Sequence, residues 1–245
     1  MGIVQFMELP VPLVLSLPDR FSDINVYLLD HLRLSPLSGE LEKVLSIDEL
    51  ERRNKYVFEK DRTRYTIVRG ILRHLIANRA GTRPSEVKFA YSDRGKPECS
   101  LPTLNPEFSF NVSHTQGYSL IGISSRHLIG IDIEHTGRHT DTESIVASFF
   151  TSDELEQWIK IDTADRRDAF FKWWVQKEAY LKWSGLGIAY GLSSFSVDID
   201  PAAPGAFTAT DDKYGSELPF LHVWEPWEDC KAAVCVSRSN NRTNA

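Results

Sequence analysis

The sequence has few cysteines, no excess of basic charge and no long apolar run, and each shortage excludes a class of protein. Its 245 residues include three cysteines and no CxxC pair, which argues against a disulfide framework and favours a reducing compartment. Lys and Arg number 28 against 34 Asp and Glu, so the basic field of a nucleic-acid binder is absent. No apolar run is long enough to cross a bilayer, and the proline-containing N-terminus lacks the basic start of a signal peptide. We therefore expect a cytoplasmic protein that binds neither nucleic acid nor membrane.

An enzyme that uses its own serine or cysteine as nucleophile is not indicated either. There is no GxSxG segment, and adjacent residues such as Ser113 and His114 cannot hydrogen-bond as members of a catalytic triad do. These two residues fit a turn with a capping serine, or a site where His114 donates to a phosphate. Cys230 and Cys235 lie in an apolar stretch and are predicted to be buried strand residues.

Hydrophobic periodicity predicts an α+β fold. Ser46 and Glu49 form a capping-box pattern that opens a helix through about residue 58, and apolar residues at helical spacing predict a second helix over 60–79. Further helices are predicted over 154–161 and 163–183. Strands are predicted at 23–31, 87–92, 108–113, 118–124, 128–135, 195–199, 206–210, 221–225 and 232–237.

The two halves of the chain have similar element orders, each with a long helix and a small set of strands. We expect two similar lobes related by a pseudo-twofold axis, each a small sheet packed with a long helix. The lobes are predicted to span 1–126 and 127–238, and residues 239–245 are expected to form a disordered tail. Because both lobes lie in one chain, the cleft between them needs no second subunit, and we expect a monomer.

Asp132 and Glu134 form a DxE pair in a predicted strand, where positions i and i+2 point to the same face. If that face is covered, a cation would compensate their repulsion, and hard carboxylate oxygens favour Mg²⁺ over zinc. The alternative is a solvated strand face, because DxE alone is a weak motif.

Glu178 and Lys182 strengthen the case for a metal. Both lie in an apolar arc of the predicted helix over 163–183, where an unpaired carboxylate is costly. Their i, i+4 spacing fits a plain helix ion pair. A metal beside Glu178 and a phosphate beside Lys182 would also explain why both charges occupy this arc.

Other charged residues fit more than one interpretation. A basic stretch at 52–73, including Arg53 and Arg64, is either an anion site or a solvated helix face. Lys96 is either an ordinary turn lysine or lies over a ligand where Gly95 lets the backbone approach. Glu154 completes a capping box with Thr151, which is sufficient reason for its presence.

Several segments together resemble the Sfp-type 4'-phosphopantetheinyl transferase family. GIDIE (130–134) and WWVQKEAYLKWSGLGI (173–188) are similar to its two signature segments, with FFTSDELE (149–156) between them. RGKP (94–97) and FNVSHT (110–115) are similar to upstream family segments in the usual order, and KDRTRYTIVRGILR (60–73) resembles the family's Arg-bearing helix. The resemblance covers about residues 45–240.

The resemblance implies a role for each matching residue. Asp132, Glu134 and Glu178 would hold Mg²⁺, and Glu178 would also be the general base for the carrier serine. Lys182 would contact the pyrophosphate of coenzyme A, and Glu154 is a further candidate near the metal. The residues that would bind the rest of coenzyme A are Arg53, Arg64, Ser113 and His114 at the phosphates and Arg94, Gly95 and Lys96 at the adenine end.

The function implied is Mg²⁺-dependent transfer of 4'-phosphopantetheine from coenzyme A to a serine of an apo acyl or peptidyl carrier protein, with release of 3',5'-ADP. Such carriers serve fatty acid, polyketide and nonribosomal peptide synthesis, and the sequence does not say which carrier is used. Two alternatives stay open. Release of inorganic phosphate would favour another Mg²⁺-dependent phosphohydrolase, and binding without Mg²⁺ or 3',5'-ADP would favour a non-catalytic coenzyme A or carrier-binding module.

Overall fold

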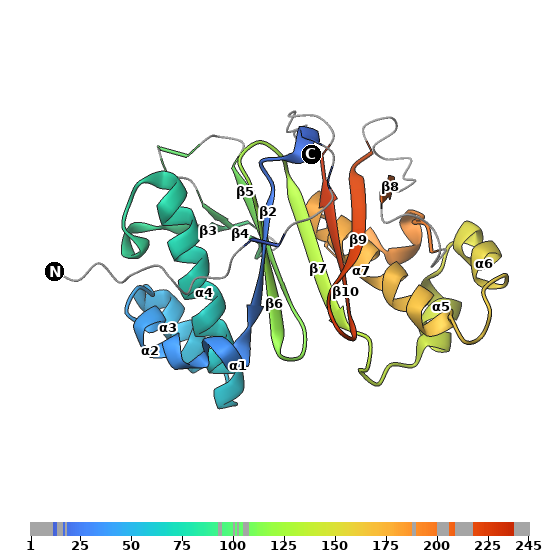
Figure 1. The fold of residues 1–245 in the computed structure, drawn as a ribbon, viewed down its shortest axis with the longest axis horizontal. Coiled ribbons are helices and arrows are strands. Elements are labelled where there is room, and N and C mark those ends of the chain that lie inside the picture. The colour runs from blue at the N-terminus through green and yellow to red at the C-terminus, as the bar shows by residue number, and fades with distance from the viewer. Residues whose placement is uncertain are drawn as a thin grey trace.

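The computed structural model describes residues 12–13, 17, 19–92, 95–99, 101, 103–104, 108–187, 190–199, 206–208 and 218–237. Within them the chain forms four layers, with two antiparallel sheets in the middle and helices on both outer sides (Figure 1). The expected α+β fold of two sheet-and-helix lobes is confirmed. The segment between the two sheets contains residues 126 and 127, and the lobe boundary there stays a prediction. The expected tail at 239–245 lies outside the described residues.

The first sheet has the strand order β1-β2-β6-β5. Tyr27 and Val112, on the strands flanking β6, both pair with Ile121. Beside this sheet lies a separate hairpin of β3 (Phe89–Tyr91) and β4 (Pro97–Cys99). The strands of the first sheet are β1 (Pro12–Leu13), β2 (Asn25–Asp30), β5 (Ser109–His114) and β6 (Tyr118–Ser124).

The long helix α4 (Glu59–Ala80) covers the outer face of this sheet, with Ile67 and Ile71 in a core shared with Ile121 and Ile123. It ends at Gly81, whose φ of 66° is the left-handed conformation that glycine adopts most readily. Both predicted helices of this lobe are confirmed, including the capping box of Ser46 and Glu49. The smaller helices are α1 (His31–Leu34), α2 (Ser38–Glu42) and α3 (Ile47–Asn54).

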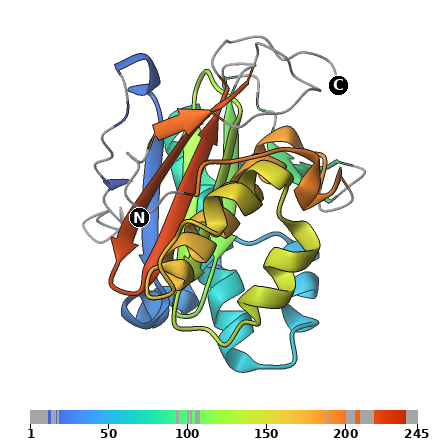
Figure 2. The same cartoon turned by 90° about the vertical axis from the view of Figure 1, so that its right-hand side faces the viewer.

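The second sheet has the order β7-β10-β9-β8. Its outer face is covered by α7 (Arg166–Ser184), with α5 (Thr142–Phe149) and α6 (Ser152–Trp158) beside it (Figure 2). Cys230 and Cys235 are free and buried in β10, as expected. The strands are β7 (Ile129–His135), β8 (Ala206–Thr208), β9 (Phe220–Trp227) and β10 (Cys230–Val236). No helix in the described part of the chain is long and apolar enough to span a membrane.

Strand β7 lies between α7 and the first lobe, and this position orients its side chains. Ile131 and Ile133 belong to the core between the two sheets. Gly130, on the alternate face, lies so close to α7 that a Cβ atom there would be 2.1 Å from the carbonyl oxygen of Ala179. Because side chains alternate along a strand, Asp132 shares that α7-facing side with Gly130.

One expectation about the second lobe is wrong, and one of its helices was not predicted. The strand expected at 195–199 is wrong, because only an isolated bridge forms at Ser196. The backbone N–H groups of Val197 and Ile199 donate to the side chains of Glu154 and Gln157 instead of a neighbouring strand. Helix α5 was not anticipated; it begins where the side chain of Asp141 accepts from the backbone N–H of Ser144.

Candidate active site

Asp132 is the centre of a buried polar cluster that joins the two lobes. Its Oδ1 atom accepts a hydrogen bond from Ser113 Oγ of β5 at 2.6 Å and from Lys182 Nζ of α7 at 2.6 Å. Lys182 Nζ also donates to Ser113 Oγ at 2.9 Å. The other carboxylate oxygen, Oδ2, is buried and has no hydrogen-bond partner among the described residues. A buried, unsatisfied carboxylate oxygen is costly unless a cation or donor arrives to meet it.

Glu134 lies two residues further along β7 and has several partners. Its Oε1 accepts from Arg138 Nη1 at 3.0 Å and from Trp174 Nε1 at 3.2 Å, and Thr115 Oγ1 donates to Oε2 at 3.3 Å. Burial first, and then the negative charge of Asp132, raise the pKa of Glu134 above its ordinary value. Arg138, Trp174 and Thr115 were not predicted as parts of this site.

Glu178 lies on α7, one helical turn before Lys182. Burial and then the charge of Asp132 raise its pKa, while Lys182 opposes the shift. Asp132, Glu134 and Glu178 are therefore electrostatic neighbours. Within the described ranges, however, no three His, Cys, Asp or Glu side chains are grouped with the geometry of a metal site.

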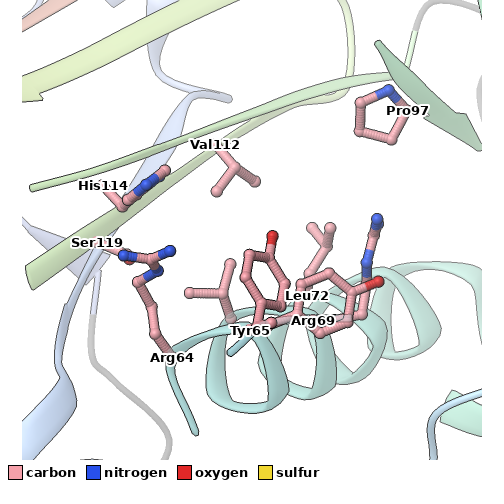
Figure 3. Close-up of a pocket in the computed structure, with 10 residues that line it drawn as sticks. Arg64, Tyr65, Arg69, Leu72, Pro97, Val112, His114 and Ser119 are labelled. Atoms are coloured by element: carbon pink, nitrogen blue, oxygen red, sulfur yellow. The ribbon is translucent and has the colours of Figure 1, made fainter. Parts of the chain in front are cut away.

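A cavity of about 160 Å³ lies between α4, β4 and the first sheet (Figure 3). Arg64 from α4 and His114 from β5 both line it, with Tyr65 and Arg69 further along the helix. Partial desolvation, followed by the positive charges of Arg64 and Lys182, lowers the pKa of His114. The cavity therefore combines an arginine, which is always charged, with a histidine that is neutral near pH 7.

A second cavity of about 320 Å³ lies beside the first and shares Pro97 and Val112 with it. It is lined by Gly95 and Lys96 on one side and by Glu178 and Lys182 on the other. Lys96 Nζ donates to the backbone carbonyl of Lys182 at 2.9 Å, so this lysine spans the two lobes. The two cavities together extend from Glu178 and Lys182 to Arg64 and His114.

Two predicted ligands of coenzyme A, Arg53 and Arg94, are not among the described residues that line these cavities. Arg53 donates to Thr66 Oγ1 at 3.0 Å and pairs with Glu42 at 3.2 Å, and it does not line either cavity. Its neighbour Arg52 lies over the ring of Tyr91, 5.5 Å from the ring centroid. Arg94 lies outside the described residues.

The hydroxyl of Tyr91 accepts a hydrogen bond from Arg69, which lines the first cavity. Arg52 is therefore linked through Tyr91 to a residue that lines the first cavity, whereas the partners of Arg53 are Thr66 and Glu42. Arg69 and Arg73, further members of the basic stretch, both pair with the buried Glu49, at 3.2 Å and 2.7 Å. These two arginines of the stretch therefore hold α3 against α4.

The hydrogen-bond and ion-pair partners of the Glu154 side chain in the described residues are a lysine and backbone N–H groups, not Asp132, Glu134 or Glu178. Its carboxylate pairs with Lys177 Nζ at 2.7 Å and accepts from the backbone N–H groups of Val197 and Thr151, each at 2.9 Å. Both charged side chains are fully buried. The residue completes the predicted capping box with Thr151 and fixes α6 against α7.

Comparison with known proteins gives two family matches that together span most of the chain. A model of the 4'-phosphopantetheinyl transferase superfamily matches residues 128–235, and a model of the N-terminal part of 4'-phosphopantetheinyl transferases matches residues 36–126. The chain is 35% identical over 203 residues to the 4'-phosphopantetheinyl transferase HetI of Nostoc sp., covering 81% of each chain. It is 28% identical to the 4'-phosphopantetheinyl transferase Sfp of Bacillus subtilis, covering 82% of this chain and 88% of Sfp.

Proposed function

This chain belongs to the 4'-phosphopantetheinyl transferase superfamily, and on that premise we propose how its own side chains transfer 4'-phosphopantetheine from coenzyme A to a carrier protein. Membership in the family sets aside the phosphohydrolase and the non-catalytic binding module. The family generally uses Mg²⁺ together with coenzyme A. The observation that carries our assignment is the buried, unpartnered Oδ2 of Asp132 beside two further carboxylates.

Asp132, Glu134 and Glu178 are the residues that would hold Mg²⁺. All three offer hard oxygen ligands, which suit this ion. The raised pKa values of Glu134 and Glu178 reflect burial and mutual repulsion, which a bound cation would relieve. The ion would supply positive charge to the pyrophosphate oxygens as the phosphoryl group is transferred.

Lys182 is the residue that would contact the pyrophosphate. Its ammonium group uses two of its three N–H donors on Asp132 and Ser113 and leaves one for a ligand. It also lines the second cavity, next to Glu178. A fixed positive charge at this point would stabilise the charge that develops on the phosphoryl oxygens and on the departing 3',5'-ADP.

Glu178 would act as general base for the carrier serine, directly or through a water molecule. A carboxylate with a raised pKa is a better proton acceptor than an ordinary one. The serine hydroxyl loses its proton to Glu178, its oxygen attacks the β-phosphate of coenzyme A, and the bond to 3',5'-ADP breaks. No nucleophile of the enzyme takes part, in agreement with the sequence.

The two cavities would hold the nucleotide part of coenzyme A. Arg64 and His114 line the first cavity and suit a phosphate, while Gly95 and Lys96 line the second and suit the adenine end. In place of Arg53, we propose Arg52 as the α3 arginine that contacts a phosphate, because it lies over Tyr91, whose hydroxyl bonds to the cavity-lining Arg69. We also propose that the protein is a monomer, with the cleft formed by its own two lobes.

Two substitutions test this assignment. Asp132→Ala and Glu178→Gln should retain the far-ultraviolet circular dichroism of the wild type and lose at least about 100-fold in transfer rate, because each removes a proposed metal ligand. Glu225→Gln, which changes an exposed carboxylate paired with Lys231, is the matched control and should keep full activity. Full activity in Asp132→Ala and Glu178→Gln would refute the proposed metal site.

A further inference from the structure

Strand β5 and the residue after it, Thr115, place a polar side chain toward β7 at every second position, and the partners of these side chains change along the row. The first two members bond to the backbone of β7: Ser109 Oγ accepts from the N–H of Ile129 at 3.3 Å, and Asn111 Oδ1 accepts from the N–H of Ile131 at 3.2 Å. These bonds replace a backbone ladder between the two strands. They join the two lobes along the edge of β7.

The last two members of the row, Ser113 and Thr115, reach carboxylates instead. Ser113 Oγ donates to Asp132 Oδ1 at 2.6 Å. Thr115 Oγ1 donates to Glu134 Oε2 at 3.3 Å and accepts from the N–H of His135 at 2.9 Å. The first lobe thus supplies one hydroxyl to each carboxylate of the DxE pair in the second lobe.

The hydroxyl of Ser113 has a direction that its neighbours fix. It accepts from Lys182 Nζ, so its own hydrogen is turned toward Asp132 Oδ1. Oδ1 therefore accepts hydrogen bonds from both Ser113 and Lys182. Oδ2 of the same carboxylate is buried and has no partner among the described residues. The two bonds to Oδ1 hold the carboxylate in one rotation and leave Oδ2 as the oxygen available to a further ligand.

We propose that Ser113 and Thr115 are positioning residues that aim Asp132 and Glu134 at the divalent cation. The inference rests on the proposed metal ligands. Hydrogen bonds to ligating side chains fix ligand orientation, and their loss commonly weakens metal affinity about 10- to 100-fold. The signal was present in the sequence as the alternation of Ser109, Asn111, Ser113 and Thr115, but their partners lie on a strand of the other lobe.

The matched control lies in the same row. Ser109→Ala and Ser113→Ala each remove one buried hydroxyl that bonds to β7, but only Ser113 bonds to a carboxylate. Thr115→Val removes the hydroxyl with little change of shape, and Thr115→Ser keeps it. Stability of the four variants is measured by thermal unfolding, where we expect similar small losses for Ser109→Ala and Ser113→Ala.

The test is Mn²⁺ binding to the full chain with coenzyme A present and no carrier protein, followed by electron paramagnetic resonance of free Mn²⁺. We expect the Mn²⁺ dissociation constant to rise about 10- to 100-fold in Ser113→Ala and Thr115→Val and to stay at the wild-type value in Ser109→Ala and Thr115→Ser. Asp132→Ala should abolish binding.

Two results would overturn the proposal in distinguishable ways. If Asp132→Ala abolishes binding while Ser113→Ala and Thr115→Val bind as Ser109→Ala does, the metal site stands and the positioning role is wrong. If Asp132→Ala binds Mn²⁺ like the wild type, the proposed ligand set fails and the positioning role fails with it.

Discussion

Replacing Glu154 by Gln tests whether this carboxylate stabilises the fold or serves the metal site. The Glu154–Lys177 pair is fully buried, with both side chains 0% exposed and Nζ 2.7 Å from Oε1. Oε1 also accepts from the N–H of Val197, and Lys177 donates to the carbonyls of Leu192 and Phe195. The substitution keeps the size of the side chain and removes its charge.

The structure allows the loss to be estimated. Removing one partner of a buried ion pair leaves the other charge uncompensated and typically costs about 3–5 kcal/mol. The amide nitrogen of Gln also cannot accept the N–H bonds that the carboxylate accepts now. The exposed pair Lys43–Glu40, with side chains 68% and 61% exposed, provides a comparison expected at about 0–1 kcal/mol.

The assay is urea unfolding of Glu154→Gln beside Glu40→Gln, followed by the Mg²⁺ dependence of transfer at a temperature where both variants are folded. We expect Glu154→Gln to lose about 3–5 kcal/mol and to need the same Mg²⁺ concentration as the wild type. A loss below about 1 kcal/mol would refute the structural role, and a tenfold higher Mg²⁺ requirement would show that Glu154 serves the metal site.

Three further predictions follow from single contacts. Gly130→Ala would place a Cβ atom 2.1 Å from a carbonyl oxygen of α7 and should cost about 3 kcal/mol or more in urea unfolding, whereas Gly39→Ala, with no atom within 4 Å, should not destabilise the protein. Arg52→Ala should raise the KM for coenzyme A about tenfold while Arg53→Ala leaves it unchanged; equal effects would contradict the assignment of Arg52. Burial and the charge of Arg64 lower the pKa of His31 from 6.5 to about 4. Between pH 4 and pH 6.5 the imidazole is therefore protonated in the unfolded chain and neutral in the folded one. The free energy of unfolding should fall as the pH falls from 6.5 to 4. His31→Gln should flatten that part of the pH–stability curve, and an unchanged slope would exclude His31 as its source.

Local signals predicted the parts of the fold that depend on local chemistry. The capping box at Ser46 marks the start of α3, and Gly81, in the left-handed conformation, marks the end of α4. Alternation along β7 correctly predicted that Ile131 and Ile133 point to the face of the strand opposite to Asp132. Glu178 and Lys182, in the apolar arc of α7, indicated the site because a buried charge needs a partner.

The interactions that the sequence did not reveal are those that no local periodicity or capping pattern marks. The segment at 195–199 alternates like a strand, but side chains of α6 satisfy the N–H groups of Val197 and Ile199. Arg138 follows Glu134 by four residues outside any helix, so no periodicity links the two. The choice between Arg52 and Arg53 depends on one residue of helix register, which only the packing of α3 against α4 decides.

Intact-mass measurement of carrier proteins tests the central claim most directly. A panel of apo acyl and peptidyl carrier proteins at matched concentration is incubated with the protein, coenzyme A and Mg²⁺, and each carrier is weighed while 3',5'-ADP is quantified. We predict that at least one carrier gains the mass of one phosphopantetheine group with an equal amount of 3',5'-ADP, and that Asp132→Ala abolishes both. Absence of any mass gain across the panel, with the wild-type protein folded, would contradict the account.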